Sequence, residues 1–343
     1  MNNNPFTITF GKQPTRLIER YEDADRIISS FTAENAVSQT YLIEGIRGSG
    51  KTVLMTSVAK RLAEDKDWIV INLNPAMDLL TGFATRLSEA VRSKTDVVNR
   101  GFNISAGGFG IGVNAGEQLS DPVGITEKAF KTIIKKGKRV LITIDEVVND
   151  DNMRIFASQF QIFVRQDYPI FLIMTGLYEN INEIQNDPSL TFLLRSPKVI
   201  TGPLSLLQIK RQYKEIFNVD DKKAGEYAAI TKGYAFAFQA LGVCLWDNSN
   251  LGAALEKFDE MLDDFVYKKI WTSLTPKERD IVLAIQEDKE KIGNICERVN
   301  MANGTFSKYK ESLERKGVIG SAGYGYVTLS LPRFHEIVSN YIN

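Results

Sequence analysis

Histidine and cysteine are nearly absent from this chain of 343 residues, which has one histidine, His335, and two cysteines, Cys244 and Cys296. One histidine is too few for a His-rich metal site, and a nucleophile activated by histidine is not expected. The cysteines stand far apart and outside any CxxC spacing, so we expect both to pack in a core within a reducing compartment. Any chemistry must therefore use carboxylates, lysine, arginine, hydroxyl groups or a bound metal ion.

The chain also lacks a surplus of charge and a long apolar run. Its 42 basic residues balance 42 acidic residues, so any surface that attracts nucleic acid or a membrane must be local. No apolar run is long enough to span a bilayer. The first ten residues, MNNNPFTITF, have neither the charged nor the apolar region of a signal peptide. These features predict a cytoplasmic protein.

Short apolar runs alternate with helical patterns up to about residue 200. The runs are rich in Ile and Val and continuously apolar, which is typical of strands covered on both faces. This alternation predicts an α/β fold with a parallel sheet between helices. Strands are expected at 41–44, 68–73, 140–144, 170–175 and 199–201, and helices at 52–64, 78–93, 125–136 and 153–165.

The pattern changes twice further along the chain. Four helical patterns follow residue 203, and from about residue 266 three more helices precede two short strands around a Gly-rich turn. The latter order is that of a winged helix-turn-helix. We therefore expect an α/β core over 1–203, an all-helical lid domain over 204–265 and a winged-helix domain over 266–343. The later helices are expected at 205–217, 222–231, 234–247, 251–264, 276–287, 292–299 and 305–316.

One segment of the expected core interrupts the alternation. Gly101–Gly124 has alternating apolar residues on both sides of the pair Gly107–Gly108. That pattern is typical of a β-hairpin. We expect an inserted hairpin at about 101–116, and the sequence does not say what it contacts.

The stretch GIRGSGKT lies between an expected strand and an expected helix and fits the pattern G-x-x-x-x-G-K-[ST]. Glycines let the backbone curl so that several N–H groups point at one anion, and the next helix directs its positive dipole end there. Lys51 would reach the β- and γ-phosphates, and the Thr52 hydroxyl would bind Mg²⁺. The expected nucleotide-binding residues are Gly45, Ile46, Arg47, Gly48, Ser49, Gly50, Lys51, Thr52 and Val53.

An acidic pair follows another expected strand in RVLITIDEV. The carboxyl ends of parallel strands share one edge of the sheet with the phosphate loop. Asp145 would hold Mg²⁺ through water, and Glu146 would orient or deprotonate the attacking water. The alternative is a solvated acidic pair at the end of a strand.

Two further residues are candidates for a role in hydrolysis. Thr175 ends an expected strand, where its hydroxyl would sense the γ-phosphate or position the water; the alternative is an ordinary threonine before a turn. Arg195 precedes the last expected strand and could reach the γ-phosphate of a neighbouring subunit. The alternative for Arg195 is a surface arginine at the end of a helix.

The order of these parts resembles that of AAA+ ATPases of the origin-recognition and STAND-related group, which carry a winged-helix tail. GIRGSGKT resembles their Walker A motif, LITIDEV their Walker B motif, FLIMTGL their sensor-1 strand and LLRSPKVITGPLS their arginine region. The resemblance covers nearly the whole chain. It implies a sheet order of 5-1-4-3-2 and an ATPase that uses Mg²⁺.

The resemblance also implies contacts to the adenine. The family has an apolar residue and an Arg-x-Glu before the first helix, and here these are Ile18, Arg20 and Glu22. TKGYAFAFQALG resembles a Gly-x-Pro motif of the lid, but Ala235 stands where proline is usual. The same helix has no clear sensor-2 arginine.

The third helix of the expected winged helix carries Lys308, Lys310, Arg315 and Lys316. Glu311 and Glu314 dilute this charge, and the region from residue 268 onward has about twelve basic and nine acidic residues. Phosphate contacts dominate most DNA affinities, so this small surplus predicts weak, salt-sensitive binding to double-stranded DNA. The alternative is a winged helix that docks on protein.

Three functions follow from these observations. The first is an ATP-binding, Mg²⁺-dependent switch that hydrolyses ATP slowly and contacts DNA. The second is a signalling or defence ATPase whose winged helix binds protein, and the third is a nucleotide-binding protein with negligible turnover. The loop itself does not exclude GTP, so ATP rests partly on the resemblance. A homo-oligomer is implied only by the interpretation of Arg195.

Overall fold

The computed structural model describes residues 4–9, 16–92, 121–248 and 250–342. The hairpin expected at 101–116 lies outside these ranges. Within them, no helix is both long enough and apolar enough to cross a membrane.

The chain divides into two compact units. The first contains Met1–Ile18, Gly45–Gly50 and Gly202–Asn343, and the second contains Glu19–Glu44 and Lys51–Thr201. The glycine-rich loop therefore groups with the first unit, although the strand before it and the helix after it belong to the second.

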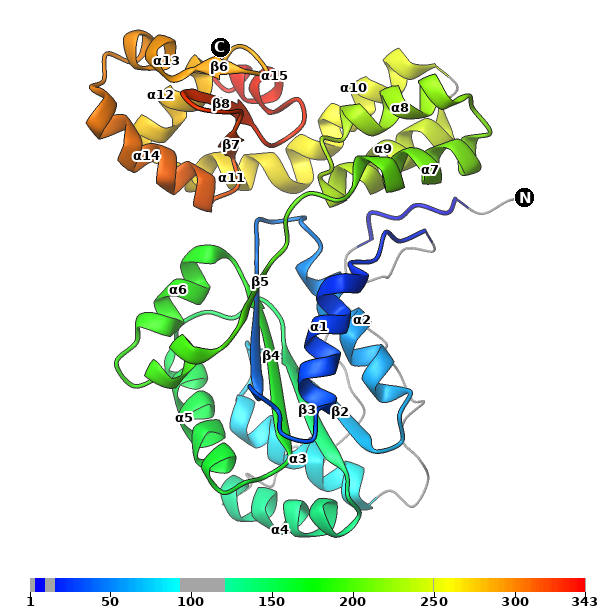
Figure 1. Cartoon of the computed structure of the whole chain (residues 1–343), viewed down its shortest axis with the longest axis vertical. Helices are drawn as coiled ribbons and strands as arrows, with labels where there is room; N and C mark the ends of the chain where they lie inside the picture. The colour runs from blue at the N-terminus through cyan, green and yellow to red at the C-terminus, as the bar shows by residue number, and fades with distance from the viewer. Residues whose placement is uncertain (1–3, 10–15, 93–120, 249, 343) are drawn as a thin grey trace. The chain divides into compact units, whose positions relative to one another are not determined.

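A parallel sheet forms the centre of the second unit, with strand order β2-β3-β4-β1-β5 (Figure 1). The expected order is confirmed, and each strand lies within one residue of its expected ends. Glu44 pairs with Gly176 and Ile144 pairs with Met174, so β1, β3 and β4 end at one edge of the sheet. The strands are β1 (Thr40–Glu44), β2 (Trp68–Leu73), β3 (Arg139–Ile144), β4 (Ile170–Gly176) and β5 (Lys198–Ile200).

Both faces of this sheet are covered, which explains why its strands are continuously apolar. Successive side chains of a strand point to opposite faces. In β4, Leu172 joins a core with helices α3 to α6, while Phe171 and Ile173 join a separate core with α1 and α2. The helices are α1 (Tyr21–Thr32), α2 (Lys51–Ala63), α3 (Leu79–Arg92), α4 (Pro122–Lys135), α5 (Asp151–Arg165) and α6 (Tyr178–Asn186).

The α/β fold is confirmed, but two helices of the second unit, α1 and α6, are not among those that the apolar pattern predicts. The sequence of α6, YENINEIQN, is short and mostly polar, and its buried residues are Ile181, Ile184 and Gln185. Two apolar positions are too few to give a helical period. A single 3₁₀ helix, Thr191–Arg195, follows before β5.

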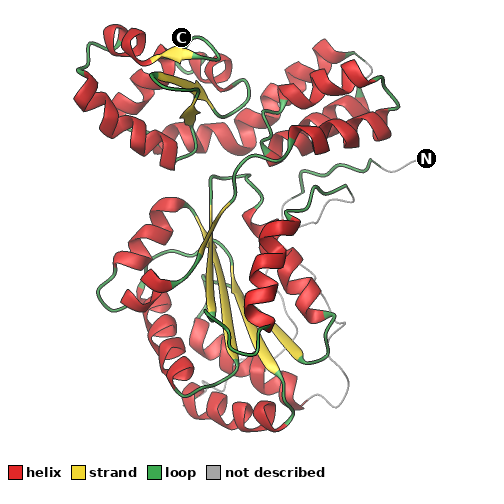
Figure 2. Ribbon diagram, in the orientation of Figure 1, coloured by secondary structure: helices red, strands yellow, loops and turns green. Residues whose placement is uncertain are grey.

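Helices make up most of the first unit (Figure 2). Four of them, which we call the helical segment, bury an aromatic cluster in which the Tyr213 hydroxyl donates a hydrogen bond to the Phe238 carbonyl at 2.7 Å. A π-helical turn, Asp263–Tyr267, then leads into α11 (Lys268–Ser273). The helical segment comprises α7 (Leu206–Phe217), α8 (Asp221–Ile230), α9 (Ala235–Asp247) and α10 (Leu251–Leu262).

The rest of the first unit, which we call the C-terminal segment, combines helices with an antiparallel sheet of order β6-β8-β7. A capping box joins Thr275 and Glu278 at the start of α12. The two-residue strand β6 and the helix α15 are too short to give a pattern. The elements are α12 (Pro276–Ala284), β6 (Glu290–Lys291), α13 (Ile292–Arg298), α14 (Asn303–Arg315), β7 (Ile319–Ser321), β8 (Tyr326–Leu329) and α15 (Phe334–Ser339).

Both cysteines are buried and neither forms a disulfide, as their isolated positions suggest. Burial raises the pKa of the Cys244 thiol to about 11. A thiol with so high a pKa stays protonated at neutral pH and is a poor nucleophile. Neither its position nor its protonation state gives Cys244 a chemical role.

Candidate functional site

The glycine-rich loop joins the end of β1 to the start of α2. Gly48 and Gly50 have φ angles of +71° and +92°, a left-handed region that favours glycine. The Ser49 amide and hydroxyl both donate to the Ile46 carbonyl, at 3.3 and 2.8 Å, and close a tight turn. This curled backbone is what a phosphate-binding loop requires.

Lys51 is the first residue of α2 and is 8% exposed. An ammonium group at the N-terminal end of a helix lies against the positive end of the helix dipole. Burial disfavours the charge further. Both effects are offset when an anion binds at this end of the helix, so the position of Lys51 suits a phosphate.

Asp145, just beyond β3, joins the start of α2 to the end of β4. The Thr52 hydroxyl donates to Asp145 Oδ2 at 2.8 Å, and the Thr175 hydroxyl donates to Asp145 Oδ1. Thr175 is fully buried in β4. Two threonines that lie far apart in the sequence thus meet at one carboxylate, that of Asp145.

Glu146 has an exposed side chain and an unusual backbone conformation. Its φ of 54° lies in the left-handed region, which costs a non-glycine residue about 1–3 kcal/mol. Its amide donates to Thr175 Oγ1 at 3.2 Å, and the next amide, that of Val147, donates to the Thr175 carbonyl at 2.9 Å. Thr175 therefore fixes the backbone that carries both acids.

The arrangement fits a magnesium nucleotide. Mg²⁺ prefers oxygen ligands and is usually bound by one or two protein groups together with phosphate oxygens and water. The adjacent Thr52 hydroxyl and Asp145 carboxylate supply such oxygens beside the end of the loop. Thr52 and Asp145 would hold the ion, and the loop amides and Lys51 would hold the phosphates.

The other predicted site residues are not part of this cluster. Ile18 is buried in the core of the first unit, and Arg20 precedes α1 in the second unit. Burial lowers the pKa of Arg20, a shift that Asp23 opposes. Arg195 is exposed at the end of its 3₁₀ helix and pairs with no carboxylate among the described residues. The roles assigned to these residues stay predictions.

Two residues that sequence reasoning missed contact the loop within the first unit. The Tyr234 hydroxyl donates to the Arg47 carbonyl at 2.6 Å, and the Phe236 amide donates to the Gly48 carbonyl at 3.0 Å. The residue between them is Ala235, where the family's motif has proline. The sequence marks Ala235 as a departure from the family's motif, but it does not indicate that Tyr234 and Phe236 contact the loop.

Most of the basic residues proposed to contact DNA are paired within α14 or the C-terminal segment. Lys310 pairs with Glu314 at 3.0 Å, and Arg315 pairs with Glu311. Lys316 pairs with Glu278, which is 2% exposed. Among the residues that the structure describes, Lys308 has no such partner and is exposed. The local positive charge of α14 is therefore smaller than its composition indicates.

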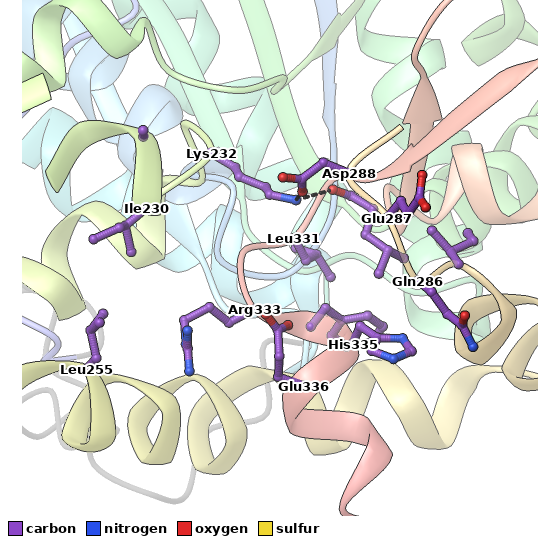
Figure 3. Close-up of a pocket in the computed structure, with 14 residues that line it drawn as sticks. Ile230, Lys232, Leu255, Gln286, Glu287, Asp288, Leu331, Arg333, His335 and Glu336 are labelled. Atoms are coloured by element: carbon purple, nitrogen blue, oxygen red, sulfur yellow. Dashed lines mark hydrogen bonds and ion pairs between the residues drawn. The ribbon is translucent and has the colours of Figure 1, made fainter. Parts of the chain in front are cut away.

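A cavity of about 430 Å³ opens in the first unit between the helical and C-terminal segments (Figure 3). Lys232 points toward Asp288 across its wall, with Nζ and Oδ1 3.0 Å apart, and Arg333 donates two hydrogen bonds to Asp259. These pairs neutralise the two cations in the wall. No residue of the glycine-rich loop lines this cavity, and we assign it no ligand.

Comparison with known proteins shows the fold. A family profile described as a domain of unknown function (DUF8462) matches residues 264–338. A search of curated proteins finds no match by sequence.

Solved structures match along almost the whole chain. The Walker-type ATPase PABY2304 of Pyrococcus abyssi has a TM-score of 0.61 at 14% identity, over 94% of this chain and 96% of that one. The Aeropyrum pernix ORC2 protein, solved in ADPNP–ADP complexes, has a TM-score of 0.62 at 13% identity, over 97% and 96%. Cdc6p from Pyrobaculum aerophilum has a TM-score of 0.52 at 13% identity, over 100% and 98%.

The pair of Lys316 and Glu278 gives a test of the C-terminal segment. Lys316 Nζ lies 2.9 and 2.8 Å from the two Glu278 oxygens, and the Ser312 hydroxyl donates to the same carboxylate. Lys316→Met should lower the free energy of unfolding by about 3 kcal/mol, because a buried carboxylate loses its cation. Lys308→Met, in α14, the helix that Lys316 directly follows, should change it by no more than about 0.5 kcal/mol. Urea unfolding measures both.

The pH dependence supplies a second measurement for the same variant. Burial raises the pKa of Glu278, but hydrogen bonds from Lys316 and Ser312 outweigh it, and the net pKa lies below the ordinary 4.5. A lowered pKa stabilises the fold above the ordinary value, and that stability is lost as pH falls through the lowered value. Lys316→Met should weaken this acid dependence. An unchanged unfolding curve in the variant would contradict the structural role of the pair.

Proposed function

Because the chain has the fold of the Cdc6- and ORC-type AAA+ ATPases, we propose that it binds ATP with Mg²⁺ and hydrolyses it slowly, as a nucleotide-controlled switch. The observation that carries the proposal is the meeting of Thr52, Asp145 and Thr175 at the end of GIRGSGKT. These residues occupy the sheet edge at which phosphates bind in this class of fold.

Each group in the site then has a distinct task. The loop amides and Lys51 bind the β- and γ-phosphates, while Thr52 and Asp145 hold the magnesium ion, which neutralises charge on the phosphate oxygens. The exposed Glu146 carboxylate accepts a proton from the attacking water or orients it. Thr175 positions both acids, since its hydroxyl donates to Asp145 and accepts from the Glu146 amide.

Glu146→Gln tests hydrolysis separately from binding. The substitution keeps the size of the side chain but removes the base, so turnover should fall by a factor of about 10²–10⁴ while ATP affinity survives. Lys51→Ala is the matched control, because it should abolish binding itself. Calorimetry with Mg-ATP and a phosphate-release assay measure the two effects. Wild-type protein without turnover, at any protein concentration and with or without DNA, would favour the binding-only alternative.

Arg195 is proposed to act on the nucleotide of a second copy of the chain. Its exposure at the end of the 3₁₀ helix supports this role. An arginine supplied in this way is worth a factor of about 10³–10⁵ in rate. The proposal implies that the active form is a homo-oligomer.

Mixing two inactive variants tests this role. Arg195→Ala should lower turnover about 10³-fold without changing ATP affinity, whereas Arg165→Ala, another exposed arginine of the same unit, should not. In a mixture, Glu146→Gln subunits supply Arg195 to Arg195→Ala subunits that keep Glu146, and part of the turnover should return. Light scattering with and without ATP reports the size of the particle. No recovery in the mixture would rule out action between subunits.

The output of the switch is proposed to be DNA contact through a winged helix formed by the C-terminal segment. The order of its helices and the β6-β8-β7 sheet support that assignment. Lys308 on α14 and the fully exposed Tyr324, at the turn between β7 and β8, are two of the exposed side chains with which this segment would contact a duplex. The ion pairs of Lys310, Arg315 and Lys316 favour the alternative output, a protein partner.

A salt series decides between the two outputs. Binding to a short DNA duplex should weaken steeply with salt, and Lys308→Ala should reduce the log–log slope by about 1. Lys310→Ala lies on the same helix but removes a cation that Glu314 already neutralises, so its slope should change less. Fluorescence anisotropy at several salt concentrations measures both. No binding, or binding without a salt slope, would favour a protein partner.

A further inference from the structure

The glycine-rich loop contains one glycine that its motif does not require. The pattern G-x-x-x-x-G-K-[ST] uses Gly45 and Gly50, whereas Gly48 occupies a free position. A β-carbon at Gly48 would lie 2.4 Å from the Tyr234 hydroxyl oxygen and 2.9 Å from the Phe236 β-carbon. The φ of +71° also favours glycine. Glycine is therefore required at position 48 because Tyr234 and Phe236 pack against the loop there and leave no room for a β-carbon.

Those residues hold two consecutive carbonyls of the loop. Tyr234 donates to the Arg47 carbonyl at 2.6 Å, and the Phe236 amide donates to the Gly48 carbonyl at 3.0 Å. In a trans peptide, the C=O and the following N–H point in opposite directions, and no described peptide is cis. Holding the Arg47 carbonyl toward Tyr234 therefore turns the Gly48 N–H away from it, which is the orientation that an anion on the other side would need.

The Tyr234 side chain is itself fixed in place. It is 5% exposed, and burial raises the pKa of its hydroxyl above the ordinary 10, so the group remains a donor at neutral pH. Its amide donates to the Thr231 carbonyl at 2.8 Å, and the Gly233 carbonyl beside it accepts from the Leu204 amide at 2.7 Å. The tyrosine thus contacts the loop from a turn that two backbone hydrogen bonds hold in place.

We propose that Tyr234 is a positioning residue that holds the glycine-rich loop in the curvature that binds the phosphates of ATP. The inference rests on the proposed function and adds to it a residue outside the loop, on the helical segment. It supplies a contact between this segment and the loop in a chain that has no clear sensor-2 arginine.

Comparison of two tyrosines separates positioning from stability. Tyr213 is also buried, and its hydroxyl also donates to a backbone carbonyl, that of Phe238 at 2.7 Å. Tyr213→Phe should therefore cost a similar amount of stability without touching the loop. Tyr234→Phe should weaken Mg-ATP binding about fivefold, which corresponds to about 1 kcal/mol at tenfold per 1.4 kcal/mol. Thermal unfolding and calorimetry of each full-length variant measure both effects.

Hydrogen exchange on the wild-type chain keeps the test decisive if Tyr234→Phe does not fold. Mg-ATP should slow exchange of the Phe236 amide, because ordering of the loop protects its bond to the Gly48 carbonyl, and should leave the Val318 amide of the C-terminal segment unchanged. Equal exchange at Phe236 with and without Mg-ATP would overturn the inference. So would wild-type affinity in Tyr234→Phe, or equal losses in Tyr234→Phe and Tyr213→Phe. Failure of wild-type protein to bind Mg-ATP at all would instead overturn the proposed function, and this inference with it.

Discussion

The carboxylate of Asp145 accepts hydrogen bonds from two threonine hydroxyls, and the geometry of the whole site depends on it. One hydroxyl comes from the first turn of α2 and the other from the end of β4. A parallel sheet brings these ends to one edge, but the sheet alone does not fix the side chains. Asp145 fixes them, because the two oxygens of one carboxylate each accept one of the two hydroxyl groups. The buried Thr175 then sets the left-handed turn at Glu146 through the amide of that residue.

Much of the fold was predictable because burial on both faces makes the strands visible as apolar runs. The five strands and the helices α2 to α5 lie close to their expected positions, and the glycine-rich loop lies between strand and helix as its motif requires. Short elements such as α6 and β6 could not be predicted, since they contain too few apolar positions to show a period. Their formation depends on packing against residues distant in sequence.

The site was predictable only as a set of residues, without their pairing. The local sequence pattern identified Thr52, Asp145 and Thr175 separately. It does not indicate that the Thr175 hydroxyl donates its hydrogen bond to Asp145. The same limit applies to charge. A count of the cations on α14 and at its C-terminal end overstated the positive surface. Lys316, for example, forms an ion pair with Glu278, a residue 38 positions earlier. Contacts of that range are decided by the fold, and so is the contact of Tyr234 with Arg47, which lies 187 positions away.

Lys232 gives the connection between α8 and α9 a second attachment. Its ammonium donates to the Leu329 carbonyl of β8 at 3.1 Å and pairs with Asp288, and its φ of 48° turns the chain sharply toward Tyr234. Lys232, whose side chain contacts β8, and Tyr234, whose side chain contacts the loop, are two residues apart, or roughly 7 Å at full extension. One short connection therefore contacts both the glycine-rich loop and the C-terminal sheet.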